Sequence, residues 1–214
     1  MQKEIPKPYL EVKSRTILER TIRVFLPLDS LRQIIVATSE WYLDRARGIL
    51  ETMLPDHITG QVVAGGQQRQ DSIRNALRVT GDATLVLVHD AVRPFVKLEH
   101  IEACCRAASE TGAAALGIPS RDTIKRIDGR RLVLDTPSRA TMWQAQTPQV
   151  FKKPLLVEAY ERAAADQFTG TDDASLVERM GRPVRMIEGD RSNIKLTYPV
   201  DLELAALMID KTEG

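Results

Sequence analysis

The sequence predicts an α/β fold, a three-layer sandwich around a mostly parallel, Rossmann-like sheet with a β-hairpin inserted as an arm. Short apolar runs rich in β-branched residues alternate with segments of helical periodicity over residues 33–117, which is the order of strands joined by crossover helices. Residues 84–89 form the most continuously apolar run, as expected for a central parallel strand. The 214 residues fit one domain over residues 1–214, with an arm at about residues 121–142.

Caps and periodicity locate the elements of the first half. Thr16 followed by Glu19 fits a capping box at the start of a helix that Pro27 ends. Gly65 and Gly66 lie at a predicted strand-to-helix turn. In chain order we expect a helix over 14–25, a strand over 33–37, a helix over 41–53, a strand over 61–64, a helix over 70–79, a strand over 84–89, a helix over 98–109 and a strand over 113–117.

The alternation then breaks. Residues 123–127 and 131–134 read as two β segments around Asp128-Gly129, a hairpin inserted into the α/β order. An isolated two-stranded ribbon is marginal in water, so this hairpin needs a surface to cover it. Beyond it we expect helices over 154–165, 173–180 and 199–209 and a strand over 184–187.

Charge and cysteine content limit the partners. Thirty Lys and Arg residues oppose 29 Asp and Glu residues, a net charge of +1, so no global basic field gathers nucleic acid or an anionic membrane. Cys104 and Cys105 have no His or Cys companions at zinc spacing, and we interpret them as reduced core residues. No apolar run approaches the ~20 residues of a membrane span, and the N-terminus lacks the apolar core of a signal peptide. We therefore expect a cytoplasmic protein.

Ligands of such a fold bind beyond the carboxyl ends of its strands. Gly65, Gly66 and Ser72 lie at one strand-to-helix turn, where backbone N–H groups can receive a nucleotide, although a Gly-Gly pair at such a turn is more often ordinary turn chemistry. Asp90 follows the most buried strand, where a carboxylate holds Mg²⁺ against phosphate oxygens, unless it caps a helix or pairs with Arg93. We expect His89 to be a hydrogen-bonded core histidine.

Other candidates have stronger structural explanations. The segments 121–125 and 139–149 flank the hairpin with cations and hydroxyl groups suited to a phosphate or polyol, but hairpin salt bridges give the same pattern. Residues 171–175 look first like a helix start. Lys195 precedes Pro199 and the last helix, which allows it to point from a strand end into the same cleft, although a lone lysine on a strand is usually just solvated.

Together these segments resemble the 2-C-methyl-D-erythritol 4-phosphate cytidylyltransferase family of the non-mevalonate isoprenoid pathway. The resembling blocks keep one order over almost the whole chain. They are Pro6-Lys7-Pro8-Tyr9-Leu10, Gly65-Gly66 with Arg69 and Asp71-Ser72, residues 88–94, Asp122-Thr123-Ile124-Lys125, residues 143–149, residues 171–175 and Asn193-Ile194-Lys195.

The resemblance implies transfer of the cytidylyl group from CTP to methylerythritol phosphate with release of pyrophosphate. By similarity, Lys7 stabilises the triphosphate charge, Asp90 binds Mg²⁺, and Arg139 and Lys195 orient the attacking phosphate. The cytidine pocket would comprise Gly65, Gly66, Ser72 and Ala91, and the methylerythritol site Arg93, Thr123 and Thr147. The family's hairpin arm reaches across a homodimer, so part of each site would come from the partner.

The sequence departs from the family at its start. Members begin with a buried strand and a glycine-rich loop that carries a catalytic arginine, whereas this sequence begins at what looks like the last Met of that loop. A missing central strand leaves unpaired sheet edges. We therefore expect a longer natural chain upstream, and poor stability and activity for a chain that starts at Met1.

Two other functions remain open. A sister cytidylyltransferase acting on ribitol 5-phosphate would share the fold, metal and CTP pocket. A non-catalytic dimeric scaffold that has lost its phosphate loop would bind only partners or nucleotide. The joint presence of Lys7, Asp90, Arg139 and Lys195 argues against the scaffold.

Overall fold

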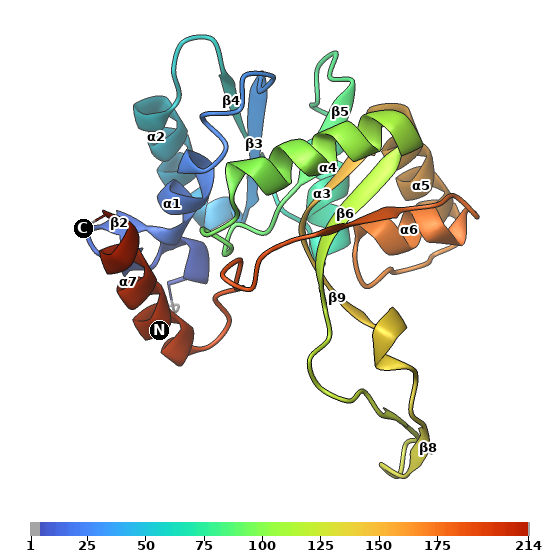
Figure 1. Cartoon of the computed structure of the whole chain (residues 1–214). Coiled ribbons are helices and arrows are strands. Elements are labelled where there is room, and N and C mark those ends of the chain that lie inside the picture. The colour runs from blue at the N-terminus through green and yellow to red at the C-terminus, as the bar shows by residue number, and fades with distance from the viewer. Residues whose placement is uncertain (1–4, 214) are drawn as a thin grey trace.

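The computed structural model describes residues 5–213 and is built around a four-stranded sheet with the strand order β10-β6-β9-β5 (Figure 1). The strands are β5 (Leu85–Val88), β6 (Ala113–Pro119), β9 (Trp143–Lys152) and β10 (Arg185–Glu188). β10 is parallel to β6, and β9 runs antiparallel to both β5 and β6. β5, β6 and β10 thus run in one direction and β9 in the other, so two of the three pairings are antiparallel and the prediction of a mostly parallel sheet is confirmed only in part.

The sequence prediction omitted β9. Its residues 143–149 carry amides and a proline, and they lack the apolar alternation that marks a strand. In the structure, residues 146–151 of β9 are buried between β5 and β6, and its Thr147-Pro148 peptide bond is cis. The polar side chains of this central strand thus lie inside the molecule, among the predicted site residues.

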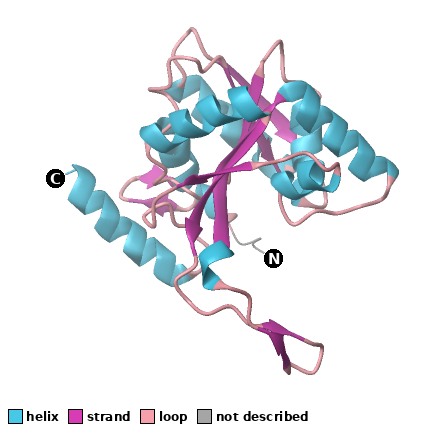
Figure 2. Ribbon diagram, turned by 45° about the vertical axis from the view of Figure 1, so that its right-hand side comes forward, coloured by secondary structure: helices cyan, strands magenta, loops and turns pink. Residues whose placement is uncertain are grey.

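Alternating side chains of the sheet pack on both faces. On one face Ala114, Leu116 and Val150 contact the buried side of α4 (Leu98–Thr111). On the other, Ala113 and Phe151 pack against α5 (Lys153–Ala165) and α6 (Asp173–Arg179). Figure 2 shows helices on both sides of the strands, as the predicted three-layer α/β arrangement requires.

A separate two-stranded sheet precedes this one. β3 (Gln33–Thr38) and β4 (Thr59–Ala64) pair in parallel, and α2 (Leu43–Met53) packs on them, as predicted for successive strand and helix units. α3 (Arg69–Leu77) follows β4. Among residues 5–213, no strand pairing joins β3 or β4 to β5. β3 and β5 therefore each keep one edge without a strand partner in the described part of the chain.

The expected helix over 14–25 begins later than predicted. The antiparallel strands β1 (Glu11–Val12) and β2 (Arg15–Thr16) precede α1 (Ile17–Arg23). Lys13 and Ser14 both have positive φ, 52° and 62°, which is the backbone of a two-residue hairpin turn and is incompatible with a helix. The predicted capping box of Thr16 and Glu19 is present at the start of α1.

The predicted hairpin is shorter than expected. β7 (Arg126–Ile127) and β8 (Val133–Asp135) pair over few residues, joined by a loop that contains Asp128-Gly129. The arm projects away from the body, below β9 in Figure 1. Its apolar residues Ile127, Leu132, Val133 and Leu134 are each more than half exposed, so one chain provides no cover for them. The last helix, α7 (Pro199–Glu213), packs against β1 and α1 through Ala205 and Ile209.

Candidate active site

Asp90 lies directly beyond the carboxyl end of β5 and is surrounded by cations. Its Oδ1 is 3.4 Å from Nε of Arg69, and its Oδ2 is 3.2 Å from both Nε of Arg93 and Nζ of Lys195. Only 11% of the Asp90 side chain is exposed. Burial alone would raise the pKa of this carboxyl group, but the charges of Lys195, Arg69 and Arg93 outweigh it and lower the pKa. Asp90 is therefore an ionised carboxylate among three cations at the predicted edge of the sheet.

A chain of hydrogen bonds fixes the backbone at Asp90. Nε2 of His89 is 2.9 Å from the carbonyl oxygen of Arg93, which only accepts, so Nε2 carries the proton. Nδ1 of His89 then accepts from the Thr147 hydroxyl at 3.0 Å, and the Thr147 oxygen accepts from the Asp90 N–H at 3.0 Å. Burial lowers the pKa of His89 to about 4. His89 is thus a neutral, hydrogen-bonded histidine, as the sequence indicated.

The loop after β10 carries Lys195 and contacts two other predicted cations, Arg93 and Lys7. Arg93 donates to the carbonyl oxygen of Asn193 at 2.8 Å, and Nζ of Lys7 donates to the carbonyl oxygen of Thr197. The prediction that Lys195 lies at a strand end is wrong, because residues 189–198 form a loop. That loop is held by Asn193, fully buried, whose Nδ2 donates to the carbonyl oxygen of Thr147 at 2.9 Å. Lys7, Arg93 and Lys195 thus belong to one region of the structure.

The predicted glycine turn joins β4 to α3. The N–H of Gly66 donates to Oγ of Ser72 at 3.0 Å, and the N–H of Gly65 donates to the carbonyl oxygen of Thr38 at 2.7 Å. A side chain at residue 66 would place its Cβ 2.1 Å from Cβ of Asp71, so this close turn requires glycine. Gly65, Gly66 and Ser72 line a hollow of about 380 Å³ together with residues 37–41. The predicted nucleotide turn therefore borders open space.

Ala91 packs against the strand pair β3 and β4, and the glycine turn follows β4. Its carbonyl oxygen accepts from Oγ1 of Thr21 at 3.0 Å, and its side chain packs against the apolar cluster that contains Val36 of β3 and Val62 of β4.

Two predicted residues lie apart from these. Arg139, in the short helix Arg139–Thr141, donates to the carbonyl oxygen of Arg121 at 3.1 Å, and Thr123 is exposed on the arm. Neither makes a hydrogen bond or an ion pair with Asp90, Arg93 or Lys195 within the described chain. The arm itself projects away from the body (Figure 1).

Comparisons with known proteins agree on one family. The family model for 2-C-methyl-D-erythritol 4-phosphate cytidylyltransferase matches residues 1–211. The chain belongs to this cytidylyltransferase family. The 2-C-methyl-D-erythritol 4-phosphate cytidylyltransferase of Caldanaerobacter subterraneus subsp. tengcongensis is 40% identical over 99% of this chain and 93% of its own length. That of Geobacillus thermodenitrificans is 39% identical over 95% and 88%, respectively.

Solved structures of the family have the same fold. The 4-diphosphocytidyl-2C-methyl-D-erythritol synthase of Anaerococcus prevotii superposes with a TM-score of 0.88 at 32% identity, covering 95% of this chain and 90% of its own. The 2-C-methyl-D-erythritol 4-phosphate cytidylyltransferase of Thermus thermophilus gives a TM-score of 0.79 at 32% identity, over 96% and 94%. Within residues 5–213 of this cytidylyltransferase, no helix is long and apolar enough to cross a membrane.

The cytidylyltransferase also has interactions at this edge that sequence reasoning did not place there. Arg69, for which the sequence predicted no role beyond the glycine motif, forms ion pairs with both Asp90 and Asp173. Its Nη2 is 2.8 Å from Oδ2 of Asp173. Asp172 caps α6 as predicted, and the N–H of Ser175 donates to its Oδ1 at 2.9 Å. Asp173 is instead fully buried and also accepts from the Tyr160 hydroxyl. The sequence offers one signal for this pairing, because two acids are adjacent at a helix start that needs only one of them as a cap. Nothing in the sequence indicates that the second acid pairs with residue 69.

Proposed function

We propose that the protein transfers the cytidylyl group from CTP to 2-C-methyl-D-erythritol 4-phosphate, releasing pyrophosphate. The observation that carries this is Asp90, which lies among Arg69, Arg93 and Lys195 at the sheet edge. Such a cluster suits two phosphorylated substrates, because it offers more positive than negative charge in a protein whose net charge is only +1. The acceptor in this proposal is the one after which the family is named, 2-C-methyl-D-erythritol 4-phosphate.

The chemistry requires positioning more than proton transfer. Two anions must meet in line while charge grows on the phosphoryl and leaving oxygens, so fixed cations lower the barrier. In this proposal Lys7 stabilises the triphosphate, and Lys195 and Arg139 orient the attacking phosphate. Gly65, Gly66, Ser72 and Ala91 receive the cytidine, and Arg93, Thr123 and Thr147 bind the methylerythritol phosphate. His89 is neutral and engaged at both nitrogens, so we assign it no proton transfer.

The residues present fit one Mg²⁺ that arrives with CTP. Among residues 5–213, no group of three or more His, Cys, Asp or Glu side chains is placed to hold a metal. Mg²⁺ in nucleotide sites needs only one or two carboxylates and takes its remaining ligands from phosphates and water, and Asp90 supplies one carboxylate. A bound Mg²⁺ would neutralise charge on the phosphate oxygens, while Asp90 would hold it and Lys195 would remain on the phosphates.

The working unit in this proposal is a homodimer joined through the arms, in the cytoplasm. Arg139 and Thr123 lie on the arm, apart from Asp90, and the arm's apolar residues are exposed in one chain. A partner would cover those residues and receive Arg139 and Thr123 beside its own Asp90. The two free cysteines, Cys104 and Cys105, suit a reducing compartment.

A further strand between β3 and β5 also belongs to this proposal. Both strands keep one unpaired edge among residues 5–213, and unpaired backbone groups inside a sheet are costly. A strand that paired with both edges and led into a phosphate-binding loop would complete the sheet.

Turnover assays test the reaction. The natural protein is supplied with CTP, Mg²⁺ and either methylerythritol phosphate or ribitol 5-phosphate, and pyrophosphate release is followed. We expect release with methylerythritol phosphate and at least about 10²-fold less with ribitol phosphate. Release only with ribitol phosphate would identify the sister enzyme, and failure to bind CTP in calorimetry would favour a non-catalytic scaffold.

A further inference from the structure

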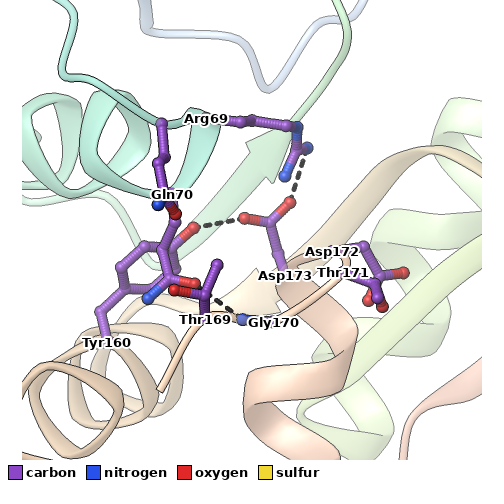
Figure 3. Close-up of a pocket in the computed structure, with 9 residues that line it drawn as sticks. Arg69, Gln70, Tyr160, Thr169, Gly170, Thr171, Asp172 and Asp173 are labelled. Carbon is purple, nitrogen blue, oxygen red and sulfur yellow. Dashed lines mark hydrogen bonds and ion pairs between the residues drawn. The ribbon is translucent and has the colours of Figure 1, made fainter. Parts of the chain in front are cut away.

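We propose that Asp173, braced by Tyr160, is a positioning residue that holds the Arg69 guanidinium back from Asp90 and thereby keeps Asp90 available to a divalent cation. The inference rests on the proposed role of Asp90 toward Mg²⁺ and deepens it. It concerns a network behind the site, made of Arg69, Asp173 and Tyr160, which we call the Arg69 relay. Figure 3 shows these three side chains converging on the Asp173 carboxylate.

The distances show how the Arg69 charge is divided. Its Nη2 is 2.8 Å from Oδ2 of Asp173, whereas its Nε is 3.4 Å from Oδ1 of Asp90. Coulombic attraction weakens with separation, so Asp173 is the stronger partner. Asp173 has no exposed side-chain surface, whereas 38% of the Arg69 side chain is exposed. A buried carboxylate needs a cation, because an unpaired buried charge is costly, and Arg69 supplies it.

Asp173 itself is held in place. Its second oxygen, Oδ1, accepts from the Tyr160 hydroxyl, so both carboxylate oxygens are engaged. Tyr160 is 3% exposed and packs in the core beside Leu156 and Val177. The Asp173 end of the relay therefore rests on rigid core packing, while the Asp90 end lies at the sheet edge.

The division of charge matters at Oδ1 of Asp90. Its other oxygen, Oδ2, already has Arg93 and Lys195 at 3.2 Å. Among the described residues, Arg69 is the one cation paired with Oδ1, at the longer distance of 3.4 Å. A guanidinium that closed fully on Oδ1 would compete with Mg²⁺ for the same carboxylate. The ion pair with Asp173 holds the Arg69 guanidinium away from Oδ1 of Asp90.

The relay also lines a cavity of about 180 Å³ formed by residues 68–70, Tyr160 and residues 169–173. Thr169 lines the same cavity and belongs to neither ion pair, so it offers a matched control.

The experiment measures the Mg²⁺ dependence of CTP binding by calorimetry, which needs no turnover. In Asp173→Asn the guanidinium is released toward Asp90, and we expect the half-saturating Mg²⁺ concentration to rise about tenfold. Tyr160→Phe removes one hydrogen bond and leaves the charge, so a rise of about two- to threefold is expected. Thr169→Val should match the parent protein. Thermal melting verifies that each variant is folded.

A double variant separates positioning from a general structural role. Arg69→Gln combined with Asp173→Asn removes the competing cation and the buried charge together, and Arg69→Gln alone completes the cycle. We expect the double variant to regain the parent's half-saturating Mg²⁺ concentration. A double variant as impaired as Asp173→Asn, or an Asp173→Asn variant with the parent's Mg²⁺ dependence, would overturn the relay. Failure of the parent protein to bind CTP at any Mg²⁺ concentration would instead overturn the proposed function and the relay with it.

Discussion

At the scale of single residues, the site depends on a hydroxyl more than on a base. Thr147 is 5% exposed, accepts from the Asp90 backbone and donates to His89. The carbonyl of Arg93 determines the tautomer of His89, and that tautomer determines which way the Thr147 hydroxyl points. The orientation of Asp90 therefore depends on a neighbouring strand, β9, which carries Thr147.

Replacing Thr147 tests this dependence. Thr147→Val keeps the shape but leaves the Asp90 N–H and Nδ1 of His89 without their partner. We expect a loss of about 1–3 kcal/mol in the free energy of unfolding and at least a tenfold loss in kcat/KM. Urea unfolding and steady-state kinetics measure the two effects. Thr147→Ser, which keeps the hydroxyl, should recover most of both, and equal losses in Val and Ser would contradict the role of the hydroxyl.

At the scale of elements, local hydrogen bonds decide where α1 begins. The Thr16 backbone N–H donates to Oε2 of Glu19 at 2.6 Å, and the Glu19 N–H donates to Oγ1 of Thr16 at 3.1 Å. The turn at Lys13 and Ser14 comes directly before this box. A short hairpin and a capped helix thus form one compact unit, against which α7 packs.

This capping box gives the stability a pH dependence. Partial burial opposes ionisation of Glu19, but its hydrogen bonds from Thr16 prevail and lower its pKa below the ordinary 4.5. Since the folded pKa is the lower one, the stabilisation is complete above the unfolded pKa and is lost as the pH falls through the folded pKa. Glu19→Gln should therefore cost about 0.5 kcal/mol at pH 7, and less below the ordinary pKa.

Urea unfolding of the parent and the Glu19→Gln variant at neutral pH and at about pH 3.5 measures this difference. A difference between the two proteins that stays constant with pH would show that the carboxylate charge is not involved. Glu40→Gln, at an exposed residue of the short helix Glu40–Tyr42, is the matched control for removal of one surface charge.

At the scale of the whole molecule, one chain separates groups that the proposed reaction needs together. Asp90 and Lys195 lie in the body, whereas Arg139 and Thr123 belong to the arm, whose apolar residues are exposed. The extended arm buries none of its own apolar residues, so its two-stranded ribbon is stable only when another surface covers them. A second copy related by two-fold symmetry provides that surface on both sides at once.

Mixed dimers test this arrangement. Arg139→Ala and Lys195→Ala are co-expressed with different affinity tags, and the heterodimer is purified through both tags. We expect each homodimer to lose about 10²-fold or more in kcat, while the heterodimer keeps about half of the parent's activity, because one of its two sites carries both defects and the other carries none. If Arg139 and Lys195 of one chain served the same site, every site would be defective and the heterodimer would be inactive.

The sequence alone determined the α/β class, the position of most elements and the candidates at strand ends. These features are local: β-branched runs, helical periodicity, the Thr16 box and the glycines at residues 65 and 66 are visible within a few residues of each other. The same holds for Asp90, because the most buried strand directly precedes it. Two of the boundaries that failed are residue 14, where a turn with positive φ stands in place of the predicted helix, and residues 123–125, which form no regular structure.

The tertiary structure alone decided how the site is assembled. β9 carries polar side chains that read as a loop until neighbouring strands bury them, so no periodicity reveals it. The pairing of Arg69 with Asp173 joins residues 104 positions apart, and the shared use of Arg69 by two carboxylates depends on the docking of α6 beside α3. From the sequence, Asp173 looks like an exposed acid near a helix cap, but it is fully buried, and a buried carboxylate needs a cation beside it. Such long-range pairing depends on which surfaces meet in space, which is why it appears only in the folded protein.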